Sequence, residues 1–230
     1  MPAPDSAAAN KPDALPAPPP LRLLVASSNP GKVREYRELV APLCAGGAPK
    51  TPAIHLDPLP NFDTIPPFDE TAPTFAENAA GKALHYSRHA AADAIVLADD
   101  SGLVVPALGG APGVHSARYA GPGATDEDRY RKLLRALDGK KGDARCAYFV
   151  CVIAIARAGR ALAIVSARAD GRITQEPRGS HGFGYDPVFF FEELGRTYAE
   201  TTREEKNVYS HRGKAFRKLL EMLAGPDRIK

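Results

Sequence analysis

Two neighbouring aspartates follow a wholly apolar stretch of the chain. Asp99 and Asp100 come directly after Ala94–Ala98, which predicts a buried strand, and Gly102 predicts a turn behind them. Ligands of open α/β sheets collect at the carboxyl ends of strands, where Mg²⁺ prefers one or two carboxylates with phosphate oxygens and water. Adjacent carboxylates can also raise each other's pKa, as a general base requires. The pair therefore predicts a Mg²⁺ site with a base, and a plain strand-terminating turn is the alternative.

A second candidate is a turn between a predicted strand and a predicted helix, Ser27-Ser28-Asn29-Pro30-Gly31-Lys32. The apolar run Leu21–Ser27 predicts the strand, and the spacing of apolar residues over Lys32–Val40 predicts the helix. A helix N-terminus offers free N–H groups and a partial positive charge, so it suits a phosphate. Val33 stands where a Walker A loop needs Ser or Thr. The turn predicts a different kind of phosphate contact, with an ordinary strand-to-helix connection as the alternative.

Polar side chains recur along one face of a long predicted helix, Pro73–Ala92. Thr74, Asn78 and Lys82 are spaced i, i+4, i+8, so they share a face that could reach a phosphate. A solvated helix face is the alternative. Glu70 precedes the helix. Its carboxylate could belong to the site, or it could simply interact favourably with the positive end of the helix dipole.

The glycine-rich segment Ser180–Pro187 holds one aromatic ring between two glycines. The glycines allow the backbone to approach a flat ligand closely, and Phe183 can stack on that ligand. Asp186 can accept hydrogen bonds from the edge of a base. The alternative is a hairpin loop with core aromatics.

Basic residues open the last predicted helix. Ser210 is a plausible N-cap, which makes His211 and Arg212 donors in the first turn, and Lys206 lies just upstream. Cations are disfavoured at a helix N-terminus. Their placement suggests an anionic or carbonyl-bearing ligand, with solvent-exposed basic residues as the alternative.

Histidines and cysteines elsewhere indicate no further site. His85 and His89 are four residues apart on the long helix and could bind zinc, but no third ligand of suitable spacing lies nearby. Cys44, Cys146 and Cys151 form no CxxC pair, and the last two point to opposite faces of one predicted strand. An odd cysteine count without a framework fits a reducing cytosol.

The remaining pattern predicts an α/β fold with a mixed sheet, because helices alternate with strands before a hairpin follows. The further predicted elements are a short strand near Ile54–Leu56, a helix over Thr125–Leu137, strands over Arg145–Arg157 and Arg160–Ala169 joined at Ala158-Gly159, a strand over Pro187–Phe191 and a helix over Ser210–Ala224.

The chain of 230 residues suits one domain, residues 21–230, behind a disordered Ala- and Pro-rich tail, residues 1–20. The net charge of +3 is too small to argue for nucleic acid. No segment approaches the ~20 apolar residues that span a bilayer, and the start of the chain lacks the pattern of a signal peptide.

Taken in order, these motifs resemble the dITP/XTP pyrophosphatases, the inosine triphosphate pyrophosphatase family. The segments that carry the resemblance, between Leu21 and Leu223, are Ser27–Lys32, Glu70-Thr71, Thr74–Asn78, Lys82, Ala98–Leu103, Leu108–Gly113, Ser116–Tyr119, Gly182–Pro187, Thr202–Lys206 and Ser210–Gly213. Departures are small. Ala72 stands where members often have Gly, and Ser27 where many have Thr, so the hydroxyl is kept.

The resemblance implies an elongated mixed sheet flanked by helices, with two lobes and a nucleotide-binding cleft between them. It implies a cytoplasmic homodimer that uses Mg²⁺ and clears deaminated purine triphosphates (dITP, ITP, XTP) before they are misincorporated into DNA and RNA. No nucleic acid or membrane partner is expected.

By the family pattern, Asp100 is the proton acceptor and a metal ligand, and Asp99 and Glu70 help to hold Mg²⁺. In some members the residue aligned with Asp69 also lies at the metal. The implied substrate contacts are Ser27, Ser28, Asn29, Pro30, Gly31 and Lys32 at the triphosphate, Lys82 and Ser101 at phosphate or sugar, and Phe183, Gly184, Tyr185, Asp186, Lys206, His211 and Arg212 at the base.

The resulting hypothesis is attack of a water, deprotonated by Asp100, on the α-phosphorus, with release of pyrophosphate. One rival is a Maf-type nucleotide pyrophosphatase with another base preference, whose early Ser-x-Ser-x-Arg signature differs from Asn29 and Lys32 here. A second rival is a non-enzymatic nucleotide or RNA-binding module. Such a module gains nothing from Asp99, Asp100 and Glu70. A purely structural domain is the third, and it leaves the acidic pair unexplained.

Overall fold

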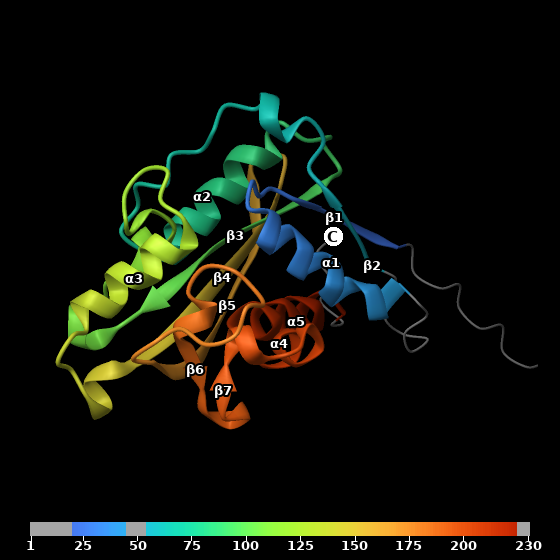
Figure 1. Cartoon of the computed structure of the whole chain (residues 1–230). Coiled ribbons are helices and arrows are strands. Elements are labelled where there is room, and N and C mark those ends of the chain that lie inside the picture. Colours follow the sequence, from blue (N-terminus) through green and yellow to red (C-terminus); the bar gives the residue numbers. More distant parts are fainter. Residues whose placement is uncertain (1–19, 45–53, 225–230) are drawn as a thin grey trace, which may run out of the picture.

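A seven-stranded mixed sheet runs through the computed structural model, which describes residues 20–44 and 54–224 (Figure 1). The strands are β1 (Leu21–Val25), β2 (Ile54–Pro58), β3 (Ile95–Val104), β4 (Cys146–Arg157), β5 (Arg160–Ile173), β6 (Phe189–Phe191) and β7 (Arg196–Thr197). Their order is β2-β1-β3-β4-β5-β6-β7. β1 pairs in parallel with β2 and β3, and the remaining pairs are antiparallel. The predicted mixed sheet is confirmed.

Helices cover both faces of this sheet (Figure 1). The five α-helices of the described residues are α1 (Pro30–Cys44), α2 (Phe75–Ser87), α3 (Asp126–Ala136), α4 (Arg203–Tyr209) and α5 (His211–Ala224). α1 and α5 pack on one face, and α2 packs on the other. The predicted α/β fold with flanking helices is therefore confirmed, while the division into two lobes stays a prediction.

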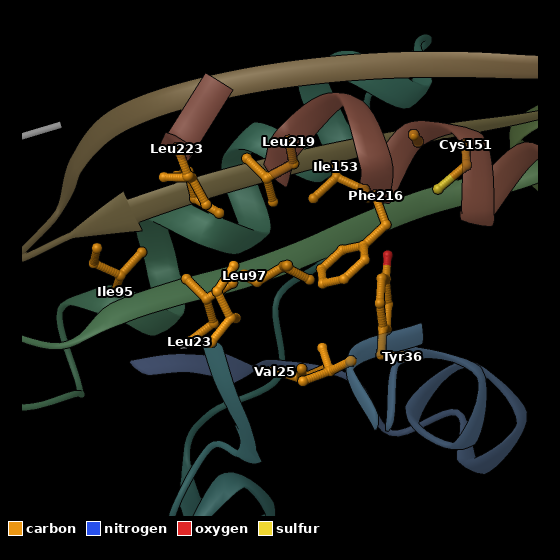
Figure 2. Close-up of a cluster of buried hydrophobic side chains, with 14 of the residues drawn as sticks. Leu23, Val25, Tyr36, Ile95, Leu97, Cys151, Ile153, Phe216, Leu219 and Leu223 are labelled. Atoms are coloured by element: carbon orange, nitrogen blue, oxygen red, sulfur yellow. The ribbon is translucent and has the colours of Figure 1, made fainter. Parts of the chain in front are cut away.

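The face under α1 and α5 is closed by large apolar side chains (Figure 2). Leu23 and Leu97 of adjacent parallel strands are fully buried there. The rings of Tyr36 on α1 and Phe216 on α5 meet edge to face, with centroids 5.6 Å apart. Full burial of one such side chain contributes roughly 1.5–3 kcal/mol. This packing fixes the start of α1 directly beyond the end of β1.

The opposite face is packed by small residues, which allow α2 to lie close to the strands. Ala79 and Ala83 of α2 are buried against Val96 and Ala98 of β3. Because side chains alternate along a strand, Leu97 and Asp99 share one face and Ala98 and Asp100 share the other. The two neighbouring aspartates therefore point in opposite directions.

The prediction that the aspartates end their strand is wrong. β3 continues to Val104, because β4 pairs with it in an unbroken antiparallel register from Val96↔Ala156 to Val104↔Tyr148. It is β1 that stops, at Val25 opposite Leu97. Asp99 and Asp100 thus lie just past the end of the neighbouring parallel strand, where the sheet surface opens.

Other element boundaries were predicted with mixed success. The Ala158-Gly159 hairpin is confirmed, and both residues have positive φ, as a tight turn of this kind requires. α2 is shorter than the predicted Pro73–Ala92, since Thr74 is its N-cap and it ends at Ser87. α4 was missed. The predicted tail lies outside the described residues except for its last position, Pro20.

The helix predicted over Thr125–Leu137 is confirmed as α3. Thr125 and Asp128 form its capping box, with each residue's side chain accepting a hydrogen bond from the other's backbone N–H. Across residues 20–44 and 54–224, no helix has the length and apolarity needed to cross a bilayer.

Candidate functional site

A cavity of about 270 Å³ opens beyond the end of β1. The sequence-predicted residues that line it are Ser27, Ser28, Asn29, Lys32, Glu70, Lys82, Asp100, Ser101, Phe183, Gly184, Tyr185, Asp186, Lys206, His211 and Arg212. Four predicted residues do not line it, Pro30, Gly31, Asp69 and Asp99. Segments that are more than 180 residues apart in the chain, by their numbering, thus line the same cavity.

The turn before α1 is built as a helix N-terminus. Asn29 Oδ1 accepts a hydrogen bond from the Lys32 N–H at 3.1 Å, so Asn29 caps the helix. Ser27 Oγ in turn accepts from the Asn29 N–H at 3.2 Å. Pro30 begins the helix, where its missing N–H costs nothing. The result is a pre-formed, partly positive turn at the cavity edge that suits an anion.

Asp99 balances two cations beneath this turn. Its carboxylate lies 3.0 Å from Lys32 Nζ and 3.3 Å from an Arg212 guanidinium nitrogen, and its side chain is only 1% exposed. Burial raises the pKa of Asp99, but Lys32 and Arg212 outweigh burial and leave it well below its ordinary value. Asp99 is therefore charged and fixes the direction in which Lys32 reaches.

Asp100 faces the α2 side of β3, together with other polar groups. Its Oδ2 accepts a hydrogen bond from Asn78 Nδ2 at 3.1 Å, and Asn78 is fully buried. Glu70 Oε1 lies 3.0 Å from Lys82 Nζ. Burial is the main reason that the pKa of Asp100 is raised; Lys82 and Lys32 oppose the rise, and Glu70 adds to it. The Asp100 carboxylate is thus held in place, with its affinity for a proton increased.

The Asp99 and Asp100 side chains leave β3 on opposite faces, and Asp99 is already paired with Lys32 and Arg212. Glu70 and Asp100 instead form the carboxylate pair at the cavity. Two carboxylates fit Mg²⁺, which takes its remaining ligands from phosphate oxygens and water. Asp69 is exposed and stands outside the cavity wall.

A soft-metal site finds no support in the ranges 20–44 and 54–224. No three His, Cys, Asp or Glu side chains converge there as a metal cluster. His85 Nε2 instead lies 2.7 Å from the Pro66 carbonyl oxygen, and its ring packs beside that of His89 with centroids 5.2 Å apart.

The predicted base-binding segment forms the far wall of the cavity. Asp186 Oδ2 accepts a hydrogen bond from the Phe183 N–H at 2.8 Å and also pairs with Lys206. Lys206 Nζ lies 4.8 Å from the centre of the Phe183 ring. Because Asp186 Oδ2 is occupied in this way, its first role is to shape the loop, not to stand free as an acceptor for a base edge.

The basic start of α5 is buried, so the alternative of solvent-exposed basic residues is wrong. Ser210 does cap the helix, since its Oγ accepts from the Gly213 N–H at 3.1 Å. Burial, Arg212 and Lys206 hold the pKa of His211 well below its ordinary value, so its ring is neutral. That ring stacks on Phe149, with centroids 4.6 Å apart. Arg212 is cationic, but Glu35 and Asp99 balance its charge.

Glu35 is the main residue that the sequence analysis missed. Its carboxylate is buried and joins Lys206, 2.7 Å away, to Arg212. Burial raises the pKa of Glu35, but Arg212 and Lys206 together leave it below its ordinary value. The one available signal was its position in the first helix: Glu35 directly precedes Tyr36, which belongs to the apolar face of that helix. For α4, the missed signal was the capping box formed by Thr202 and Glu205.

Comparison with known proteins points to one family. A family model described as the Ham1 family matches residues 23–222. A dITP/XTP pyrophosphatase of Geobacillus kaustophilus is 49% identical over 199 residues, which cover 86% of this chain and 92% of that protein. The solved structure of a HAM1 protein from Coxiella burnetii has a TM-score of 0.75 at 41% identity, covering 88% and 98% of the two chains. The Staphylococcus aureus Ham1 protein has a TM-score of 0.73 at 34% identity, with 88% and 97% covered.

Proposed function

This chain belongs to the Ham1 family, and we propose on that basis that it hydrolyses deaminated purine nucleoside triphosphates (dITP, ITP and XTP) to the monophosphate and pyrophosphate. The observation that carries the proposal is one shared cavity, lined both by the Glu70 and Asp100 carboxylates and by Ser27, Ser28, Asn29 and Lys32 at the start of α1. Such a cavity can hold a polyphosphate between a carboxylate-bound cation and a helix N-terminus.

Glu70 and Asp100 would hold a Mg²⁺ ion, and Asp69 and Asp99 are left out of this ligand set because of where they lie. When bound, Mg²⁺ supplies charge neutralisation and polarises a phosphoryl oxygen.

Asp100 would accept the proton of the attacking water. Its raised pKa suits a general base, and hydrogen bonds from Asn78 Nδ2 to Oδ2 and from the Ser101 N–H to Oδ1 fix the carboxylate, whose remaining lone pairs would receive the proton of the water. Lys32, which Asp99 orients, would stabilise the leaving pyrophosphate together with the α1 N-terminus. Lys82 and Ser101 would contact phosphate or sugar.

Base choice would follow from the direction of hydrogen bonds. Hypoxanthine and xanthine carry an acceptor at C6, whereas adenine carries an amino donor. Neutral His211 has one ring N–H to donate, and its Nδ1 is buried with no partner among the described residues. Lys206 and Arg212 add donors at the same wall. Sites that depend on such hydrogen bonds can discriminate by ~10⁴–10⁵.

The proposed biological role is to keep deaminated purines out of DNA and RNA. We propose that the protein acts as a cytoplasmic homodimer, with neither nucleic acid nor a membrane as partner. Light scattering of the purified chain measures its oligomeric state directly.

A panel of triphosphates tests the function: dITP, ITP, XTP, GTP, ATP and dTTP, each with and without Mg²⁺, with pyrophosphate as the readout. We expect release from the first three, a preference over ATP of several orders of magnitude, and loss of turnover with a chelator. A preference for a base other than the deaminated purines would favour a Maf-type enzyme. Binding of dITP without any pyrophosphate would favour a non-enzymatic module, and release of orthophosphate alone would contradict the reaction.

Gly31→Ala should weaken substrate binding without weakening the fold. A Cβ at Gly31 would lie 2.7 Å from Phe183 Cδ1, so the ring that stacks on the base must shift. Loss of one aromatic contact corresponds to a KM for dITP about two- to tenfold higher. Since Ala favours a helix more than Gly does, the Tm should not fall. An unchanged KM would show that the position of the Phe183 ring is not critical.

A further inference from the structure

The loop that carries Phe183 is held at its tip by a helix from a distant part of the chain. The Gly184 N–H donates a hydrogen bond to Asp126 Oδ2 at 2.7 Å, although 58 residues separate the two positions. Asp126 is the first residue of α3, and its other carboxylate oxygen pairs with Arg129. Arg129 also donates to the Ala124 carbonyl. The acceptor for the loop is therefore itself held by Arg129, which the Ala124 carbonyl holds in turn.

α3 is a firm support for this contact. The capping box at Thr125 and Asp128 secures its first turn, and Leu133 is fully buried in the core beneath it. Asp126 and Arg129 both line the cavity, next to Gly184. The contact to the loop thus connects the rigid helix to the wall of the site.

Further along, the loop has two other anchors. Tyr185 Oη donates to the Ser116 carbonyl at 2.8 Å, and Asp186 Oδ2 holds the Phe183 N–H. Both act on the residues that flank Gly184. The Gly184 N–H lies between these two anchors in the sequence. Its bond to Asp126 therefore fixes the backbone position of the residue that directly follows Phe183.

We propose that Asp126 is a positioning residue for purine recognition, which holds Gly184 so that the Phe183 ring stays in place for the base. This inference rests on the proposed function. A carboxylate suits the task because hydrogen bonds to a charged acceptor are stronger and shorter than neutral ones. The polar contacts of Asp126 are to Gly184 and Arg129, and none joins it to the Asp100 carboxylate among the described residues.

Asp126→Ala should raise the KM for dITP about tenfold, the equivalent of one hydrogen bond to a charged group, while kcat changes by less than about threefold. Asp126→Asn keeps an acceptor oxygen and should recover part of the loss. Arg129→Ala should fall between Asp126→Ala and the wild type. A KM unchanged in Asp126→Ala would overturn the proposal.

Thr125→Ala is the matched control for helix stability. It removes the side-chain acceptor for the Asp128 N–H in the capping box of α3 but no contact to the loop, so we expect a Tm lower by a few degrees with an unchanged KM. If Thr125→Ala raised the KM as much as Asp126→Ala does, general weakening of α3 would explain both results. That outcome would contradict a specific role for Asp126.

A direct readout does not need turnover. The chain contains no tryptophan, so Phe183→Trp places a single indole in the loop. Adding Asp126→Ala to this variant should increase quenching of the indole by acrylamide, because the loop is released. Unchanged quenching would refute the proposal even if the KM had risen. Absence of activity in the wild type would instead count against the proposed function alone.

Discussion

Replacing Asp100 by Asn should lower kcat for dITP at least ~10²–10⁴-fold, the usual contribution of general-base catalysis. Asn has the shape of Asp, and its single carbonyl oxygen can accept from Asn78 or from the Ser101 N–H, but it cannot take a proton from water. The fold should persist, because burial already disfavours the charged form of Asp100 and raises its pKa. Single-turnover rates and thermal unfolding measure the two effects separately.

The control for this substitution is Asp63→Asn, at an exposed position in the short turn Phe62–Thr64. It removes the same charge without touching the cavity, and we expect normal turnover. A titration with Mg²⁺ separates the two roles of Asp100, since a lost ligand is recovered at high Mg²⁺ and a lost base is not. Turnover near that of the wild type in Asp100→Asn would exclude Asp100 as the base.

Glu35→Ala should lower the free energy of unfolding by about 3–5 kcal/mol, the cost of breaking a buried ion pair from one side. The substitution leaves Lys206 and Arg212 buried, each with only one carboxylate partner in place of two. The base-binding wall should loosen with it, so the KM for dITP should rise as well. Urea unfolding of the two proteins gives the difference in free energy.

Glu38→Gln is the matched control on the same helix. Glu38 pairs with Arg203 at 3.4 Å, but the Arg203 side chain is 71% exposed. An exposed pair of this kind contributes roughly 0–1 kcal/mol, so the unfolding curve should hardly move. Equal destabilisation by the two substitutions would show that the buried ion pairs of Glu35 stabilise the fold no more than an exposed pair does.

The stabilisation by Glu35 should also depend on pH in a defined direction. Its pKa in the folded protein lies below its ordinary value, because Arg212 and Lys206 outweigh burial. Its contribution is therefore complete above the ordinary carboxyl pKa of about 4.3 and is lost as the pH falls through the lowered value. The free-energy difference between wild type and Glu35→Gln should shrink over that range. A difference that grows toward acidic pH would contradict the charged state of Glu35.

Local patterns in the sequence were sufficient for most of the elements. The apolar run Leu21–Ser27 marked β1, and the Ala158-Gly159 pair marked the turn between β4 and β5. The capping residues Thr125 and Ser210 marked the starts of two helices. Such signals involve residues within a few positions of each other, so no knowledge of the fold is needed to interpret them.

The end of β3 could not be predicted from the residues around it. Ser101 and Gly102 suggested a turn, yet the strand continues because the whole of β4 is available to pair with it. Gly102 is required for another reason. A Cβ there would collide with the Ser116 side chain and the Gly113 carbonyl oxygen. Its role is close packing between segments, which the sequence around it does not reveal.

The residue types of the site came from the sequence, and their partners came from the tertiary structure. Lys32, Asp100, Phe183, Lys206 and Arg212 were all identified before the fold was known. Their partners depend on contacts between segments far apart in the chain. Asp99 pairs with Lys32 and Arg212, Glu35 joins two helices, and Asp126 holds Gly184. Backbone periodicity is local, but the partner of a buried charge is set by strand register and helix packing, which no short stretch of sequence contains.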